Sequence, residues 1–228
     1  TTSDIDEFKN HLKSNLKSSG LDFSLADKTE WVQHVKNMTH FSGAKSLLRF
    51  MLFVAHDGAK IDSHDSTLIQ RNDASPDSST EFLSFGMWDK DLYETLEHVA
   101  PQNEQSHGWS GVYDDPKLKN TIGNFVLLPK GQNSALKDSA WATKKLFLRV
   151  LLSDSLTDRK TLVATAKADG TSLPKSIENG VLSTSTTLVK SHMLSGLENV
   201  IDWDADYIRK RSERLCSLVW DRMKEWLD

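Results

Sequence analysis

Two short apolar runs, separated by a long polar segment, constrain most strongly what this chain of 228 residues can fold into. Leu92 to Val99 and Asn124 to Leu128 are rich in aliphatic and aromatic residues and are bounded by turn formers, which predicts two β-strands. The segment between them, from Gln102 to Gly123, is too polar and too rich in turn formers for a regular element. Because long connections inside compact domains are usually functional, we expect the chemistry of the chain to lie here.

Helical periodicity dominates on both sides of these strands. In the N-terminal third, apolar residues recur at helical spacing in three runs, and Asp27 precedes the second run as a candidate N-cap. We therefore predict an all-helical N-terminal layer over residues 1–75, followed by a polar linker and a second domain over residues 81–228. That domain ends in a predicted helix from about Asp204 to Trp226. The expected fold is α+β and predominantly helical.

Composition excludes several classes of protein. The formal net charge is −4, so nucleic acid could be bound only through a local basic patch and not through the whole surface. A single cysteine, Cys216, excludes an internal disulfide framework and fits a reducing compartment, so we expect a cytoplasmic protein. No apolar stretch approaches the roughly 20 residues that a membrane span needs. The start at Thr1, without Met or a signal pattern, suggests a fragment of a longer polypeptide.

Polar residues with metal and acid–base chemistry lie at the ends of the predicted strands. Glu97 and His98 end the first strand, Asn124 opens the second, and Asn133 precedes the next predicted helix. A strand, a loop, a second strand and a helix in this order would form a compact ββα unit. Such a unit can hold one metal ion against a scissile phosphate.

Each of the four residues suits one task in phosphodiester hydrolysis. His98 titrates near neutrality and can accept a proton from water, an effect worth about 10²- to 10⁴-fold in rate. Glu97 and Asn133 offer the oxygen ligands that Mg²⁺ or Mn²⁺ prefers at a single site. Asn124 carries a donor and an acceptor, so it can tie the long loop to the unit and hold the His98 ring in one orientation. We expect these four side chains to meet around one cation.

Simpler interpretations exist for each residue. A lone histidine after an apolar strand is usually a hydrogen-bonded core or loop residue. Glu97 could be a surface carboxylate, or could act on the metal only through another ligand. Asn133 could be an ordinary helix N-cap, and Asn124 could belong to a turn. The order of all four along the chain favours the catalytic interpretation.

A basic stretch overlaps this region. Seven cations and one acid, Asp138, fall between Pro116 and Arg149. We predict that Lys137, Lys144, Lys145 and Arg149 contact substrate phosphates, which would make binding sensitive to salt. The alternative is a solvated helix face, which is the usual meaning of spaced lysines.

The residues quoted above also carry a family resemblance. The segment EHVAPQ, a long polar loop, IGNFVLL, an Asn and a helical Lys together resemble the HNH-type nuclease domain at the C-terminal end of GmrSD-type modification-dependent restriction enzymes. The pattern is also similar to SspE, the nicking component of phosphorothioate-based phage defence. Phe125 stands where the family usually has Leu. The spacing of Trp203, Ile208, Arg211, Leu215 and Trp220 resembles the end of such domains, so the resemblance runs from about Leu92 to the C-terminus.

The resemblance implies roles for individual residues. His98 matches the general base, Asn124 the central Asn, Asn133 the terminal ligand and Glu97 the acidic ligand position. It also implies a small ββα-metal (HNH) core flanked by helical layers. Larger members of the family add an N-terminal domain that hydrolyses nucleotides and senses modified DNA. No P-loop pattern is found here, so that domain is expected as a partner elsewhere in the full-length protein.

The expected function is metal-dependent cleavage of DNA, with nicking as the natural product of a single site. The chain would be the nuclease module of a larger restriction or anti-phage defence protein. One alternative is a catalytically silent helical module that binds DNA or a protein through the same basic face. A second alternative keeps the chemistry but takes RNA as its substrate.

Overall fold

The computed structural model describes residues 2–25, 27–39, 44–72, 82–103, 109–128, 136, 138–183 and 192–228. Its helices and strands are α1 (Thr2–Ser18), α2 (Lys28–Val35), α3 (Lys45–His56), β1 (Ala59–Ile61), β2 (Ile69–Arg71), α4 (Phe85–Trp88), β3 (Thr95–His98), β4 (Phe125–Leu128), α6 (Trp141–Leu152), α7 (Leu156–Ala168), α8 (Lys175–Val181) and α9 (Ala205–Leu227). The described part of the chain is therefore α+β and mostly helical, as predicted, and it contains two small antiparallel sheets.

Local sequence signals account for several helix ends. The side chain of Asp27 accepts hydrogen bonds from the backbone N–H groups of Thr29 and Glu30, which confirms it as the N-cap of α2. Helix α9 closes the chain almost where the periodicity predicted it. No helix in the described ranges is both long and apolar enough to cross a membrane.

The prediction of an all-helical N-terminal layer was wrong. Strands β1 and β2 form a hairpin within it, and Gly58 precedes the hairpin with a positive φ of 64°. Each strand has only three residues, which is too short for an alternating pattern to be recognised in the sequence. The hairpin is fixed from outside, because Arg214 of α9 donates to the Asp62 carboxylate at 2.5 Å and to the Ile69 carbonyl at 3.0 Å.

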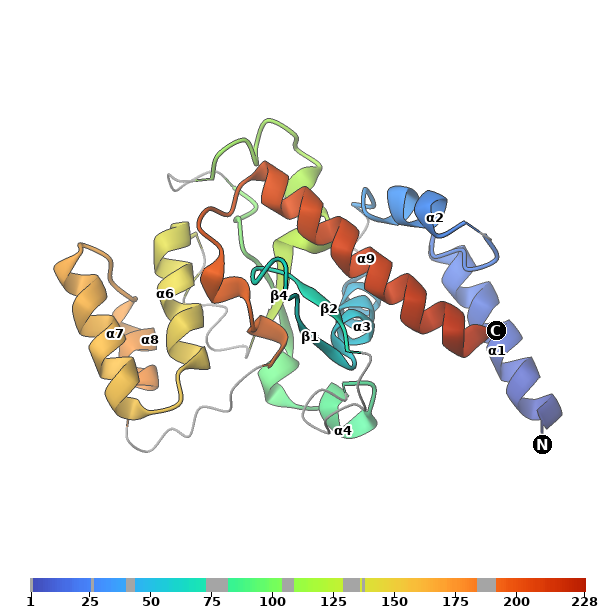
Figure 1. Cartoon of the computed structure of the whole chain (residues 1–228), viewed down its shortest axis with the longest axis horizontal. Helices are drawn as coiled ribbons and strands as arrows, with labels where there is room; N and C mark the ends of the chain where they lie inside the picture. Colours follow the sequence, from blue (N-terminus) through green and yellow to red (C-terminus); the bar gives the residue numbers. More distant parts are fainter. Residues whose placement is uncertain are drawn as a thin grey trace.

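Helix α9 organises the molecule (Figure 1). It runs along the body between α1 at one end and the group of α6, α7 and α8 at the other. A first hydrophobic core joins side chains of α1, α2, α3, β4 and the C-terminal half of α9, among them Trp31, Phe53 and Trp220. Residues of both predicted domains share this core. The first core thus does not separate the two predicted domains, and the division between residues 75 and 81 stays a prediction.

A second core lies on the other side of the β3–β4 ribbon. It contains the buried side chains of α6, together with Trp203 and the start of α9. Along β4, Phe125 and Leu127 belong to the first core, whereas Val126 and Leu128 belong to the second. This alternation is the period of two that a strand imposes on its side chains. The ribbon thus separates the two cores, and its two faces meet different helices.

His56 makes the stability of this fold sensitive to acid. The ring lies at the end of α3, where its Nδ1 is 2.7 Å from the Leu52 carbonyl oxygen, and it faces Arg211 and the edge of the Phe82 ring. The Met193 backbone and the cavity lined by Arg214 complete its surroundings. Burial lowers the pKa of His56 to about 4, and the Arg211 charge acts in the same direction.

The expected pH dependence follows from the sign of this shift. The unfolded chain binds a proton at His56 near pH 6.5, whereas the folded chain does so only near pH 4, so stability is lost as the pH falls through this window. Between pH 7 and pH 5 the wild type should lose about 2 kcal/mol more than a His56→Gln variant in urea unfolding. Equal losses in both proteins would contradict the prediction.

Candidate active site

The end of the β3–β4 ribbon carries the predicted general base. His98 pairs with Phe125 across the ribbon, and their rings touch with centroids 4.2 Å apart. On its other side the imidazole Nε2 lies 3.2 Å from the side-chain oxygen Oδ1 of Asn120. The ring is half-buried. It is therefore held by one apolar and one polar contact while part of it remains open to solvent.

The surroundings of His98 favour its neutral form. Burial lowers the pKa of the imidazole to about 4, and the hydrogen bond with Asn120 opposes this shift. The charges of Lys144, Lys119 and Lys45 lower the pKa further. At neutral pH the ring is therefore neutral and one nitrogen carries a lone pair, but the lowered pKa makes it a weaker base than the unperturbed imidazole expected from the sequence. Of these cations, Lys119 and Lys45 make its surroundings attractive to an anion, whereas Lys144 is buried in an ion pair with Glu97.

Glu97 points to the opposite face of the ribbon. It pairs across the ribbon with Val126, and its carboxylate Oε1 forms an ion pair with Lys144 Nζ of α6 at 2.6 Å. Lys144 also donates to the backbone oxygen of His98 at 2.9 Å. Burial raises the pKa of Glu97 and lowers the pKa of Lys144, while each charge opposes the shift of the other. The pair thus joins α6 to the strand that carries His98.

These positions correct one expectation and limit a second. Lys144 is only 3% exposed and donates inward, so it does not lie on a surface that contacts phosphate. The side chains of Glu97 and His98 leave opposite faces of β3, so both could approach one cation only beyond the end of the ribbon, and their convergence stays a prediction. Within the described ranges, no group of three or more His, Cys, Asp and Glu side chains could hold a metal ion.

Asn124 is the most fully bonded polar side chain of the site. Its oxygen accepts from the Ala100 backbone N–H at 2.8 Å and from the Trp203 indole N–H at 3.0 Å. Its nitrogen donates to the backbone oxygens of Ala100 and Lys119, both at 2.8 Å. These bonds join the start and the end of the long loop and bring the chain before α9 against both. None of these four hydrogen bonds reaches the His98 ring, whose polar contact is with Asn120 instead.

Helix α9 holds the start of β4 through hydrogen bonds and close packing. Arg211 is buried and donates to the backbone oxygens of Gly123 and Phe125, at 2.7 and 2.9 Å. A Cβ atom on Gly123 would lie 2.2 Å from the backbone oxygen of Ile208, so only glycine allows this close approach. The residues of the closing pattern, Trp203, Ile208 and Arg211, thus hold the strand that supports the His98 ring.

The remaining predicted residues lie elsewhere. Asn133 and Lys137 fall outside the described residues, so their predicted roles stay predictions. Lys145 and Arg149 line a groove of about 370 Å³ between α6 and α7, in which Asp169 is the acidic side chain. Neither cation forms an ion pair within the part of the chain that the structure describes. Their position therefore allows the predicted phosphate contact.

Sequence reasoning missed two residues near His98. Asn120 lies in the polar loop, where nothing in its neighbours distinguishes it from other turn formers. Lys45 begins α3, and Arg49 on the next turn donates to the Tyr93 carbonyl just before β3. The charge of Lys45 is close enough to lower the pKa of the His98 imidazole. Only the tertiary fold brings Lys45 there, so no local pattern could have indicated it.

Comparison with known families agrees with this architecture. The sequence model of the family of GmrSD restriction endonuclease C-terminal domains matches residues 58–218 of this chain. The chain belongs to this family. The GmrSD match begins at the β1–β2 hairpin, which α9 holds through Arg214, and it includes every described residue of the site except Lys45. As a GmrSD C-terminal domain, the chain is a restriction endonuclease module and hence an enzyme. A search of curated proteins gave no match.

Proposed function

We propose that this GmrSD domain is an HNH-type endonuclease that depends on a divalent metal ion and nicks DNA one strand at a time. The observation that supports it is the geometry at His98: the half-buried imidazole lies between the Asn120 amide oxygen and the Phe125 ring, and the charges of Lys119 and Lys45 act on it. Phosphodiester hydrolysis needs such a base beside positive charge. The predicted N-terminal partner domain and the cytoplasmic location remain predictions.

The residues present fit a small hard cation in the kind of donor that they offer. Glu97 supplies a buried carboxylate on the face of the ribbon towards α6, and Mg²⁺ commonly takes only one or two oxygens from protein. We propose Glu97 as one ligand, with Asn133 as the second. When bound, the ion stabilises charge on the non-bridging and leaving oxygens of the phosphate. Because Lys144 already neutralises Glu97, we expect metal binding to be weak without DNA.

The side chains of the protein provide the rest of the mechanism. His98 accepts a proton from the water that attacks the phosphorus of a DNA backbone held beside Lys119 and Lys45. As the new P–O bond forms, the bond from phosphorus to the leaving sugar oxygen breaks, and that oxygen takes a proton from solvent. Lys119 and Lys45 lower the cost of bringing the negatively charged backbone to this point. Lys144 holds the His98 backbone through its carbonyl oxygen, so the base cannot move with the loop that follows it.

The test is incubation of supercoiled plasmid with Mg²⁺ or Mn²⁺. We expect conversion to the open-circle form, loss of the reaction on adding EDTA, and its return when Mg²⁺ is restored. A His98→Ala protein prepared in the same way controls for contaminating nucleases. Binding without nicking by either protein would support the silent module instead, and preferential digestion of RNA in a parallel reaction would support the RNA alternative.

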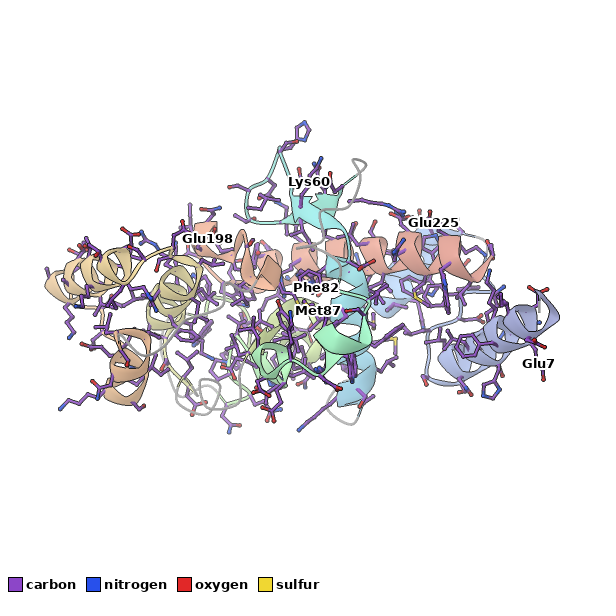
Figure 2. All side chains as sticks on the ribbon, turned by 90° about the horizontal axis from the view of Figure 1, so that it is seen from below. Glu7, Lys60, Phe82, Met87, Glu198 and Glu225 are labelled. Carbon is purple, nitrogen blue, oxygen red and sulfur yellow. The ribbon has the colours of Figure 1, made fainter. Side chains whose placement is uncertain are left out.

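Lys145 and Arg149 should contribute to binding rather than to the chemical step. If the DNA backbone passes along the groove between α6 and α7, a Lys145→Gln or Arg149→Gln variant should lower the slope of log K against log salt by about 1. Lys60→Gln is the matched control, since Lys60 is exposed on the hairpin that projects from one side of the molecule (Figure 2). Equal slopes for all three variants would exclude the groove as a phosphate site.

A further inference from the structure

The contact between Asn120 and His98 determines which ring nitrogen is basic. The amide oxygen Oδ1 of Asn120 lies 3.2 Å from Nε2 of His98. An amide oxygen can only accept a hydrogen bond, so Nε2 must carry the proton in a neutral ring. The lone pair then belongs to Nδ1. Within the described part of the chain, Nδ1 forms no hydrogen bond, which leaves it available to water.

We propose that Asn120 is the positioning residue of this nuclease centre, because it fixes His98 in the Nε2–H tautomer and leaves Nδ1 to accept the proton of the attacking water. The inference rests on the proposed function, which it deepens by naming the reactive atom. It transfers to Asn120 the orienting role that the sequence had suggested for Asn124.

The backbone around Asn120 is held firmly enough for such a role. Asn120 ends a 3₁₀ turn over Leu118–Asn120, and its backbone N–H donates to the Lys117 oxygen at 2.9 Å. The carbonyl of Lys119 accepts from Asn124, and the Lys119 ammonium donates to the Gln102 oxygen at 2.6 Å. The side-chain amide of Asn120 is therefore carried by a backbone that these hydrogen bonds hold in place.

The contact on the other side of the ring completes the orientation. Phe125 packs against the imidazole with the two planes at 50°. An aromatic ring limits movement out of the imidazole plane but does not distinguish the two nitrogens. The choice between them therefore depends on the Asn120 oxygen. With the amide reversed, its nitrogen would donate to Nε2 and force the proton onto Nδ1, which gives the opposite tautomer.

The direct test is ¹⁵N-resolved NMR of the histidine side chains, with His98 assigned by its loss in a His98→Gln variant. In the wild type we expect the Nε2–H tautomer and an Nε2-bound proton that exchanges slowly enough to be observed. Asn120→Leu should lose that proton signal, and Asn120→Asp, which keeps an acceptor oxygen, should retain it. A wild type with the proton on Nδ1, or an Asn120→Leu spectrum identical to the wild type, would overturn the inference.

Kinetics give a second readout that a purely structural role would not produce. We expect Asn120→Leu to lower kcat for plasmid nicking by about 10- to 100-fold, the usual effect of losing a group that orients a reactive side chain, with KM nearly unchanged. Asn120→Asp should restore most of the rate. Asn199→Leu removes a single amide hydrogen bond elsewhere, to the Ser66 oxygen, and should leave kcat unchanged.

The two proposals fail in different ways. If the wild type does not nick DNA, the proposed function is wrong, while the NMR result still reports on the tautomer. If the wild type nicks and Asn120→Leu nicks equally fast, Asn120 is not a positioning residue and the proposed function stands.

Discussion

Replacing His98 with alanine should reduce the rate of plasmid nicking by about 10²- to 10⁴-fold, the usual contribution of a general base. The ring supplies the neutral lone pair of the site, and burial keeps its pKa at about 4, so protonation does not compete at neutral pH. The measurement is the single-turnover rate of conversion of supercoiled to open-circle DNA at saturating protein.

The loss should fall on the chemical step and not on binding. The imidazole is neutral at the working pH, so its removal leaves the electrostatic attraction of Lys119 and Lys45 unchanged, and the dissociation constant for DNA should stay within about twofold of the wild type. His64→Ala is the matched control, because that side chain is 92% exposed in the β1–β2 turn. A His98→Ala protein that nicks as fast as the control would refute the assignment of the base.

Part of the site follows from local rules alone. The strand, loop, strand and helix order around Glu97, His98 and Asn124 was predicted from apolar runs and turn formers, and the structure has β3, β4 and α6 in that order. The same strand rule also predicts that neighbouring residues face opposite sides. Applied fully, it would have placed the side chains of Glu97 and His98 on different faces of β3.

The rotation of α6 about its axis could not be predicted, so the sequence did not show which of its basic residues are buried. The apolar residues of α6 lie on almost every face of the helix, since both Leu146 to Leu148 and Val150 to Leu152 are buried. Such a helix has no narrow apolar stripe from which to infer its orientation. The sequence therefore could not distinguish Lys144, which turns inward to Glu97, from Lys145, which lines the groove beside α7.

Contacts between segments that are distant in the sequence are the other part of the site that could not be predicted. Lys45 is 53 positions before His98 in the numbering, and only the tertiary fold brings its charge near the imidazole. Asn120 is nearer in sequence, but its selection over other polar loop residues depends on the exact path of the 3₁₀ turn. Periodicity describes which face of an element is buried, and it carries no information about which loop atom reaches a given ring.

Removing Lys144 should destabilise the fold by about 3–5 kcal/mol, because it leaves the buried carboxylate of Glu97 without a partner. Lys144→Ala should therefore unfold at much lower urea concentration than the wild type. Lys145→Ala provides the control, since the side chain of Lys145 forms no ion pair in the described ranges. This substitution should change the free energy of unfolding by less than about 1 kcal/mol.

A double-mutant cycle separates the ion pair from simple loss of volume. Replacing both partners, as Glu97→Gln with Lys144→Met, removes the two charges together and should cost much less than the single Lys144→Ala change. Additive costs for Glu97→Gln and Lys144→Met would show that the charges do not interact, contrary to the 2.6 Å contact.

The Lys144→Ala protein also tests Glu97 as a metal ligand without any measurement of activity. With the ammonium gone, a divalent cation can take over the neutralisation of the carboxylate, and binding to the folded state alone raises stability as its concentration increases. We expect Mg²⁺ or Mn²⁺ to recover part of the lost free energy of unfolding, and an equal ionic strength of NaCl not to do so. Adding Glu97→Gln should abolish the recovery, because the amide lacks the charge that attracts the ion. A recovery that survives Glu97→Gln would place the cation elsewhere and leave the ion pair with a structural role only.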